Sequence, residues 1–252
     1  MGNRIYEYPY VLGKPKFFET QAYGGERAEE RGFSWTLHGR PLHYCAGLSA
    51  PITLPSKTEP STAPAKEVIR PMTVSELLAA IRKPYVETLA RIAAEGAAHV
   101  EPAYRNSDGS LAVEGAMGTP CRVDVIAAES GEPVQVDSET ELGFEPVRFA
   151  IEQMAVVISP FGWDWLPLEV RGLSLEQASE VIRAWFFEWF DGEDENSPTE
   201  EGLQGVLHFV SDPEATEEGY RVKIDLGSAS DEALEALLFA LADAGASGAF
   251  LA

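Results

Sequence analysis

Cysteine is scarce in this sequence, and its scarcity excludes a fold that is held together by several disulfides. Only Cys45 and Cys121 are present, far apart in the chain and in no metal-binding or redox spacing. A framework of disulfides is therefore excluded, which favours a reducing compartment. The first ten residues lack the apolar core of a secretory signal, and no apolar run reaches the roughly 18 residues that span a bilayer. Together these absences predict a cytoplasmic protein.

Basic residues are also few. The chain of 252 residues holds 19 lysines and arginines against 41 acidic residues, a formal net charge of −22. Residues 164–252 carry 20 of the acidic residues and only 4 of the basic ones. A field of this sign repels nucleic acid and anionic membranes and attracts basic proteins. We therefore expect a basic protein partner, no nucleic acid and no membrane; the alternative is that the charge serves only solubility or adaptation to salt.

Catalytic motifs are missing as well. The chain contains no phosphate-binding loop, no dinucleotide-binding glycine pattern and no HExxH pair, and Ser49 stands in a broken nucleophile elbow. His43 and Cys45 share a face of a predicted strand, but no third group orients them. His208 lies among apolar strand residues, a setting typical of a packed or hydrogen-bonded histidine. The sequence thus predicts no catalytic residue, no cofactor and no metal, and it leans away from an enzyme.

The amino-acid composition changes along the chain, and these changes predict four segments. Residues 1–54 are rich in Tyr, Phe, Gly and Pro and contain a predicted hairpin, so they form an N-terminal β-hairpin arm. Residues 55–67 are a polar linker or loop, because Pro, Ser and Thr there cannot bury apolar area. Residues 68–160 form an α+β region, and residues 161–252 form a separate acidic domain.

The α+β region begins with a predicted helix. Thr73 and Glu76 fit a capping box, and apolar residues then recur at helical spacing. Pro84 is expected either to kink this helix or to begin a second one, and Gly96 stops the pattern. Short β segments follow, with a hairpin predicted between residues 122–127 and 134–137 and a strand from Met154 to Ser159.

The acidic domain has the clearest pattern. Four predicted strands surround two helices: alternating ones over 166–170 and 220–226, an apolar one over 206–210, and a short closing one over 249–252. The first helix follows the N-cap Ser174, and the second follows Ser230 or Asp231. The order β, α, β, β, α, β predicts a ferredoxin-like domain with both helices on one face of an antiparallel sheet. The fold class is therefore α+β. The first helix is expected to bury Leu175, Ala178, Ile182, Trp185, Phe186 and Trp189.

Two features of this domain predict a contact surface. Phe187 and Phe239 each point away from the apolar stripe of their helix, so either the N-terminal region covers them or they mark an interface. The segment 188–201 is acidic without any basic residue, and it fails the calcium-loop pattern at two required positions. A homodimer through Phe187 and Phe239 is an alternative use of the helices. The predicted contact residues are Phe187, Glu188, Asp191, Glu193, Asp194, Glu195, Glu200 and Glu201.

A third feature points to a ligand instead. Trp163, Asp164 and Trp165 follow Pro160-Phe161-Gly162, and aromatic walls around one carboxylate can bind a small molecule. The same residues can equally form a structural turn between two domains. The ligand site they would make is the alternative to the protein-binding surface.

The charge and the fold class favour a binding protein. Small acidic bacterial α+β proteins without catalytic motifs often neutralise toxins, because a surface of one sign steers a basic partner into fast association. We therefore expect a bacterial immunity protein or inhibitor of a basic toxin or effector. The alternatives are an enzyme or small-ligand-binding protein with a pocket near residues 161–165, and an assembly component of a phage or secretion apparatus.

Overall fold

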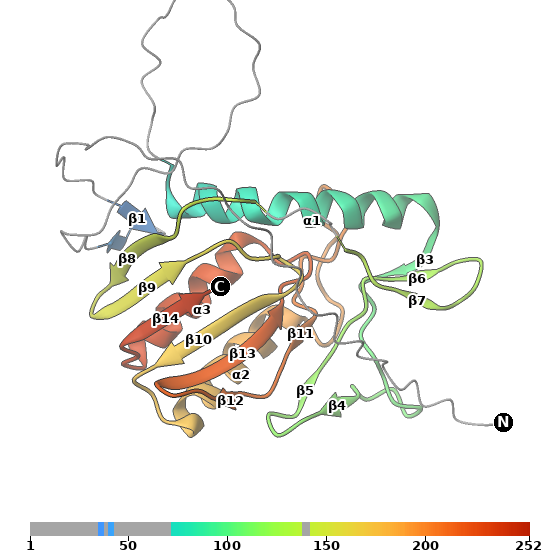
Figure 1. The fold of residues 1–252 in the computed structure, drawn as a ribbon. Coiled ribbons are helices and arrows are strands. Elements are labelled where there is room, and N and C mark those ends of the chain that lie inside the picture. Colours follow the sequence, from blue (N-terminus) through green and yellow to red (C-terminus); the bar gives the residue numbers. More distant parts are fainter. Residues whose placement is uncertain (1–34, 38–39, 43–71, 138–141) are drawn as a thin grey trace, which may run out of the picture. The chain divides into compact units, whose positions relative to one another are not determined.

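The computed structural model describes residues 35–37, 40–42, 72–137 and 142–252 (Figure 1). They belong to a compact unit that spans Gly32–Ala252. This unit has a mixed α+β architecture with three helices in its described part. The predicted linker at 55–67, and the residues His43, Cys45 and Ser49, lie outside the described residues. No helix of the described part is both long and apolar enough to cross a membrane.

A central sheet organises the unit. Its strands follow the order β11-β13-β10-β14-β9-β8, and a short strand, β12, also pairs with β13. All pairs are antiparallel except β14 with β9, which are parallel. The strands are β8 (Val147–Ile151), β9 (Met154–Ile158), β10 (Leu166–Arg171), β11 (Phe209–Val210), β12 (Glu214–Ala215), β13 (Gly219–Asp225) and β14 (Gly248–Leu251). Because β9 pairs with β14, the boundary predicted at 160/161 falls inside one sheet.

Two helices cover one face of this sheet, α2 (Leu175–Phe190) and α3 (Asp231–Asp243) (Figure 1). In β10 the residues Leu166, Leu168 and Val170 are buried and alternate with half-exposed ones, as expected for a strand with one covered face. Ser174 and Gln177 form the predicted capping box of α2. The core of the unit therefore lies between the sheet and these helices.

The third helix, α1 (Val74–Gly96), packs beside α3. Its capping box at Thr73 and Glu76 is confirmed. The helix runs through Pro84 without a break, so neither a second helix nor a new start occurs there. Ser75 Oγ donates to Glu235 Oε1 of α3 at 2.6 Å, and Arg82 donates to the carbonyls just before α3. These bonds tie α1 to the start of α3.

Small β elements occupy the rest of the unit. The strands β3 (Ala97–Val100), β6 (Val125–Ala127) and β7 (Pro133–Val134) form one sheet, and the predicted hairpin is the β6–β7 pair. The strands β4 (Val113–Glu114) and β5 (Thr119–Pro120) form a second pair. The predicted N-terminal hairpin contains the antiparallel pair β1 (Trp35–Leu37) and β2 (Arg40–Leu42).

Two details of the predicted domain need correction. Leu175 is 47% exposed, because it stands in the first turn of α2, and Phe190 at the other end of the helix is fully buried in the core instead. The strand predicted over 206–210 is reduced to Phe209–Val210. Residues 206–208 are still buried, since they pack as an extended segment whose backbone bonds to Trp189, Asp225 and Ala229.

Candidate functional site

The acidic segment, residues 188–201, leaves α2 and turns at Asp191, whose φ is 52°. The Asp191 carboxylate accepts hydrogen bonds from the amides of Glu195 and Asn196. Asp194 forms ion pairs with Arg105 and Arg122, which together hold its pKa below the ordinary value against the effect of desolvation. These contacts fix the backbone of the segment against the loops that precede β4 and β6.

The other acidic side chains of the segment stay in solvent. Glu188, Glu193, Glu195 and Glu200 are exposed, and they form no ion pair with another described residue. Glu201 is hydrogen-bonded to Thr199, which lowers its pKa. Of the predicted contact residues, only Asp194 is thus neutralised by an ion pair within the described part of the chain.

Basic side chains of the same region lie elsewhere. Arg171, Arg221 and Lys223 stand at positions of β10 and β13 that alternate with the buried ones, on the sheet face opposite the helices. There Glu169 pairs with both Arg171 and Arg221. Arg183 is the only basic residue on α2 or α3. Three of the four basic residues of segment 164–252 therefore lie on the sheet face away from α2 and α3.

Phe187 lies next to the acidic segment on α2. Its side chain is 36% exposed, and the Arg183 guanidinium stands 4.8 Å from its ring centre. Phe239 on α3 is half-buried and packs against the core cluster. A shallow groove runs between the two helices and is lined by Glu180, Val181, Ala184, Trp185, Glu188, Ala236 and Ala240.

The structure separates the three residues of the predicted ligand site. Trp163 is buried and donates its indole N–H to the Gly227 carbonyl at 3.0 Å. Trp165 is 39% exposed, and the Lys223 ammonium lies 5.4 Å from its ring centre. Asp164 is half-buried, and its desolvation, together with the nearby charges of Asp225, Asp137 and Asp124, raises its pKa to about 6. The two indoles therefore do not enclose Asp164 between them.

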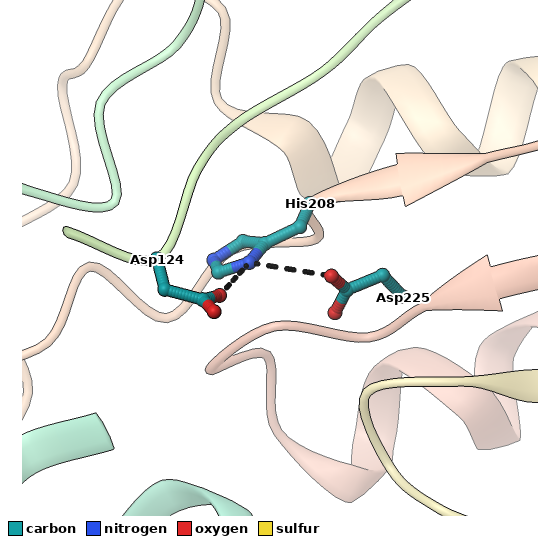
Figure 2. A group of neighbouring side chains, drawn as sticks. All are labelled: Asp124, His208 and Asp225. Atoms are coloured by element: carbon teal, nitrogen blue, oxygen red, sulfur yellow. Dashed lines mark ion pairs between the residues drawn. The ribbon is translucent and has the colours of Figure 1, made fainter. Parts of the chain in front are cut away.

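A cluster of four buried or nearly buried ionisable side chains lies close to Asp164. We call Glu101, Asp124, His208 and Asp225 the carboxylate–histidine cluster (Figure 2 shows three of its members). His208 Nε2 lies 2.7 Å from Glu101 Oε1. On the other side of the ring, His208 Nδ1 lies 2.9 Å from Asp124 Oδ1 and 3.7 Å from Asp225 Oδ2. One imidazole thus meets three carboxylates from distant parts of the chain.

Glu101 is fully buried, and its carboxylate is saturated with donors. Besides His208, it accepts hydrogen bonds from the Gln204 amide at 2.6 Å, and from both the amide and the hydroxyl of Ser228. These bonds hold the pKa of Glu101 below its ordinary value although burial alone would raise it. The backbone of Glu101 has a φ of 50°, a strained conformation for a residue with a Cβ. The fold accepts this strain where the side chain joins three segments.

The two aspartates have partners of their own. Asp124 accepts from the Tyr85 hydroxyl at 2.7 Å and from the Val136 amide, and Asp225 accepts from the Gly227 amide at 2.9 Å. Burial raises the pKa of Tyr85 and of Asp225, whereas hydrogen bonds and His208 lower that of Asp124. Burial alone would lower the pKa of His208, but the carboxylates around it raise it well above the ordinary value.

The sequence predicted His208 only as a packed or hydrogen-bonded histidine, and it singled out none of the carboxylate partners. Glu101 and Asp124 stand in irregular segments, and Asp225 occupies a position in β13 that reads as a polar strand residue. In so acidic a chain, no spacing distinguishes these carboxylates from solvated ones. Backbone hydrogen bonds between distant segments bring them together. The His208 amide donates to the Asp225 carbonyl, the Arg122 amide to the His208 carbonyl, and the Glu101 amide to the Asp124 carbonyl.

Comparison with known proteins adds no relative: no family model, no curated protein and no solved structure matches this chain. The function must therefore be argued from the surface and the cluster themselves.

Proposed function

We propose that this protein binds a basic protein partner through the acidic segment and Phe187, as a bacterial immunity protein or an inhibitor of a toxin or effector does. The observation that supports the proposal is the solvent exposure of the predicted contact residues and their lack of ion pairs. Their carboxylates are exposed, except that of the half-buried Asp191, and apart from Asp194 they have no ion-pair partner among the described residues. A partner that supplies cations would therefore not have to displace existing ion pairs.

The architecture supports the finer fold that goes with this proposal. The strands β11, β13, β10 and β14 are neighbours in that order, and each pair is antiparallel. With α2 and α3 as the crossover connections, this is the arrangement expected of a ferredoxin-like domain. We propose that assignment for residues 161–252, extended at one edge by β9 and β8. Such a fold carries many activities, so the surface and not the fold supports the function.

The local geometry favours the end of α2 as the docking point. Phe187 offers an exposed aromatic ring, and the shallow groove between α2 and α3 runs beside it with Glu180 and Glu188 in its lining. An aromatic anchor with carboxylates beside it is typical of interfaces whose partner is both basic and partly apolar, and Arg183 covers only part of this ring. The ordered backbone of the acidic segment would present its carboxylates without a large loss of conformational entropy on binding.

The proposal is tested by affinity capture from the native host at about 50 mM and about 500 mM salt. The bait is the full chain or a variant with Glu193, Glu195 and Glu200 replaced by glutamine. We expect the full chain to retain a basic protein at low salt and to lose most of it at high salt, and the variant to retain little at either. Association rates of the captured protein, once purified, should fall for the variant by about tenfold or more.

A matched variant controls for the change in net charge. Replacement of Glu129, Glu132 and Glu145 by glutamine removes the same three charges from exposed positions on the β6–β7 hairpin and ahead of β8. This control should capture the partner as the unchanged chain does. Equal loss in both variants would show that overall charge and not the acidic segment directs binding, and capture of nothing basic at low salt would reject the proposal.

A small-ligand site remains the second candidate, because one observation favours it. Asp164 keeps a raised pKa of about 6 beside the carboxylate–histidine cluster, and shifted carboxyl groups are often found at functional sites. The third candidate function is that of an assembly component, which would self-associate through Phe187 and Phe239. Light scattering of the purified chain tests for self-association. A homodimer that Phe187→Ala dissociates would favour self-association over a basic partner.

A further inference from the structure

The carboxylate–histidine cluster contains more negative than positive charge. Glu101, Asp124 and Asp225 are three carboxylates around one imidazole, which carries at most one positive charge. Among the described residues no lysine or arginine forms an ion pair with any of the three. Uncompensated charge in a protein interior is costly, so such an excess of carboxylates calls for a further cation.

One atom of the cluster is left without a hydrogen-bond partner. His208 is fully buried, and its Nδ1 makes no hydrogen bond even though two carboxylates stand beside it. The distance of 2.9 Å to Asp124 is short enough for a hydrogen bond, but the direction from the ring is not, and the 3.7 Å to Asp225 is too long. Nδ1 therefore faces the space between two carboxylates and forms ion pairs with both, drawn as dashed lines in Figure 2, but a hydrogen bond with neither.

The distances around this space fit a small metal ion. Zinc binds histidine nitrogen and carboxylate oxygen at about 2.0–2.2 Å, which places the ligand atoms of a tetrahedral site about 3.4 Å apart. The distances of 2.9 and 3.7 Å from Nδ1 to the two aspartates lie on either side of that value. One oxygen from each aspartate and the nitrogen of His208 all lie within 4.8 Å of one another.

The surroundings of the three atoms are those of metal ligands. A histidine that binds a metal through one nitrogen usually donates its other N–H to a carboxylate, which fixes the tautomer. His208 Nε2 does this toward Glu101 at 2.7 Å, and Glu101 is in turn held by Ser228 and Gln204. The ligating carboxylates also need supporting donors, which Tyr85 and Gly227 supply to Asp124 and Asp225.

We propose that Asp124 and Asp225, through carboxylate oxygens, and His208, through Nδ1, bind one divalent metal ion of the zinc class. The ion would take the place of the proton on Nδ1, which is released to solvent. The ion would join the segment before β6 to the end of β13, and because His208 has no solvent exposure, the bound ion would stabilise the packing of these two segments. Imidazole with two carboxylates suits zinc better than magnesium or calcium, which prefer oxygen ligands alone. This site is independent of the acidic surface, and it departs from the sequence-based expectation of no metal.

The test is metal binding by the full chain after removal of bound metal with a chelator. Zinc is added alone, the protein is separated by gel filtration, and the metal retained per chain is counted. We expect one zinc per chain, a rise in the melting temperature, and X-ray absorption at the zinc edge that shows one imidazole with oxygen ligands. Magnesium at the same concentration should give neither retention nor stabilisation.

Variants assign the binding to this site. Asp225→Asn and His208→Gln should each weaken zinc affinity at least tenfold and remove the stabilisation. His99→Gln, which changes an exposed histidine, and Glu235→Gln, which changes a buried carboxylate outside the cluster, should bind as the unchanged chain does.

Several results would overturn the proposal. These are a metal-free chain that takes up no zinc, zinc bound through sulfur, or zinc affinity that neither cluster variant alters. If the cluster variants do not fold, the absorption spectrum of the unchanged chain still decides, because Cys45 or Cys121 as a ligand would add a sulfur shell. The outcome is separable from that of the partner capture, since the acidic segment contributes no ligand.

Discussion

His208 Nε2 lies 2.7 Å from Glu101 Oε1, although 107 residues separate the two along the chain. Glu101 bonds at the same time to Gln204 and Ser228. One side chain thus fixes the segment after β3 to the extended residues ahead of β11 and to the turn ahead of α3. The stability of the protein should therefore depend on this carboxylate.

Glu101→Gln should strongly lower the free energy of unfolding. The amide has one acceptor oxygen in place of two and no charge, so donors that are now satisfied by the buried carboxylate lose their partner. We expect a loss of about 3 kcal/mol, the size typical of a broken buried charge pair. Urea denaturation measures it. Glu95→Gln, at an exposed helix position, should change stability by less than about 0.5 kcal/mol, and an equally small effect at Glu101 would contradict the role given to it.

Asp164→Asn should stabilise the protein at high pH and leave it unchanged at low pH. The folded state raises the pKa of Asp164 from 3.8 to about 6, so ionisation of this group costs stability. The cost is absent below pH about 4, grows as the pH rises toward 6, and is complete above it; it amounts to about 2 kcal/mol. Unfolding curves of both proteins at pH 4 and pH 8 measure the difference. A gain at Asp164 that is equal at both pH values would refute the assignment.

Gly227→Ala should destabilise the fold more than an alanine at a comparable glycine. Gly227 has a φ of 51°, and a Cβ there would come within 2.4 Å of the His208 ring and 2.5 Å of the Val206 carbonyl. Gly118 has a similar φ of 59° with no atom within 4 Å of the added carbon. Both variants bear the cost of a left-handed backbone, about 1 kcal/mol, and Gly227→Ala adds a steric cost of about 1–3 kcal/mol. Thermal denaturation of the two variants side by side measures this excess, and equal losses would show that the site tolerates the carbon.

Phe187→Ala should affect binding and not folding. The ring is 36% exposed, so its removal should change the free energy of unfolding by less than about 1 kcal/mol. Removal of an aromatic anchor should weaken capture of a basic partner by about tenfold or more. The comparison is Leu175→Ala, another exposed apolar residue of α2, which stands at the far end of the helix. If both variants captured the partner like the unchanged chain, Phe187 would lie outside the interface.

Local sequence patterns predicted many helices and strands of this fold. The capping boxes at Thr73 and Ser174 and the alternation through β10 and β13 depend on neighbours three or two residues away, so the sequence alone placed these elements. Burial was less local. Leu175 has the spacing of the apolar stripe of α2, yet it is exposed. Its burial depends on how far the first turn of the helix lies from the core, and the helical period does not contain that information.

The sequence by itself determined the α+β class, the helix starts, the central strands and the concentration of negative charge in the last third of the chain. Only the tertiary structure decided which carboxylates stay in solvent and which surround His208. The reason is physical: helical and strand periods report on contacts within a few residues. The meeting of Glu101, Asp124, His208 and Asp225 depends instead on how a sheet and several irregular segments pack, and no local pattern encodes that arrangement.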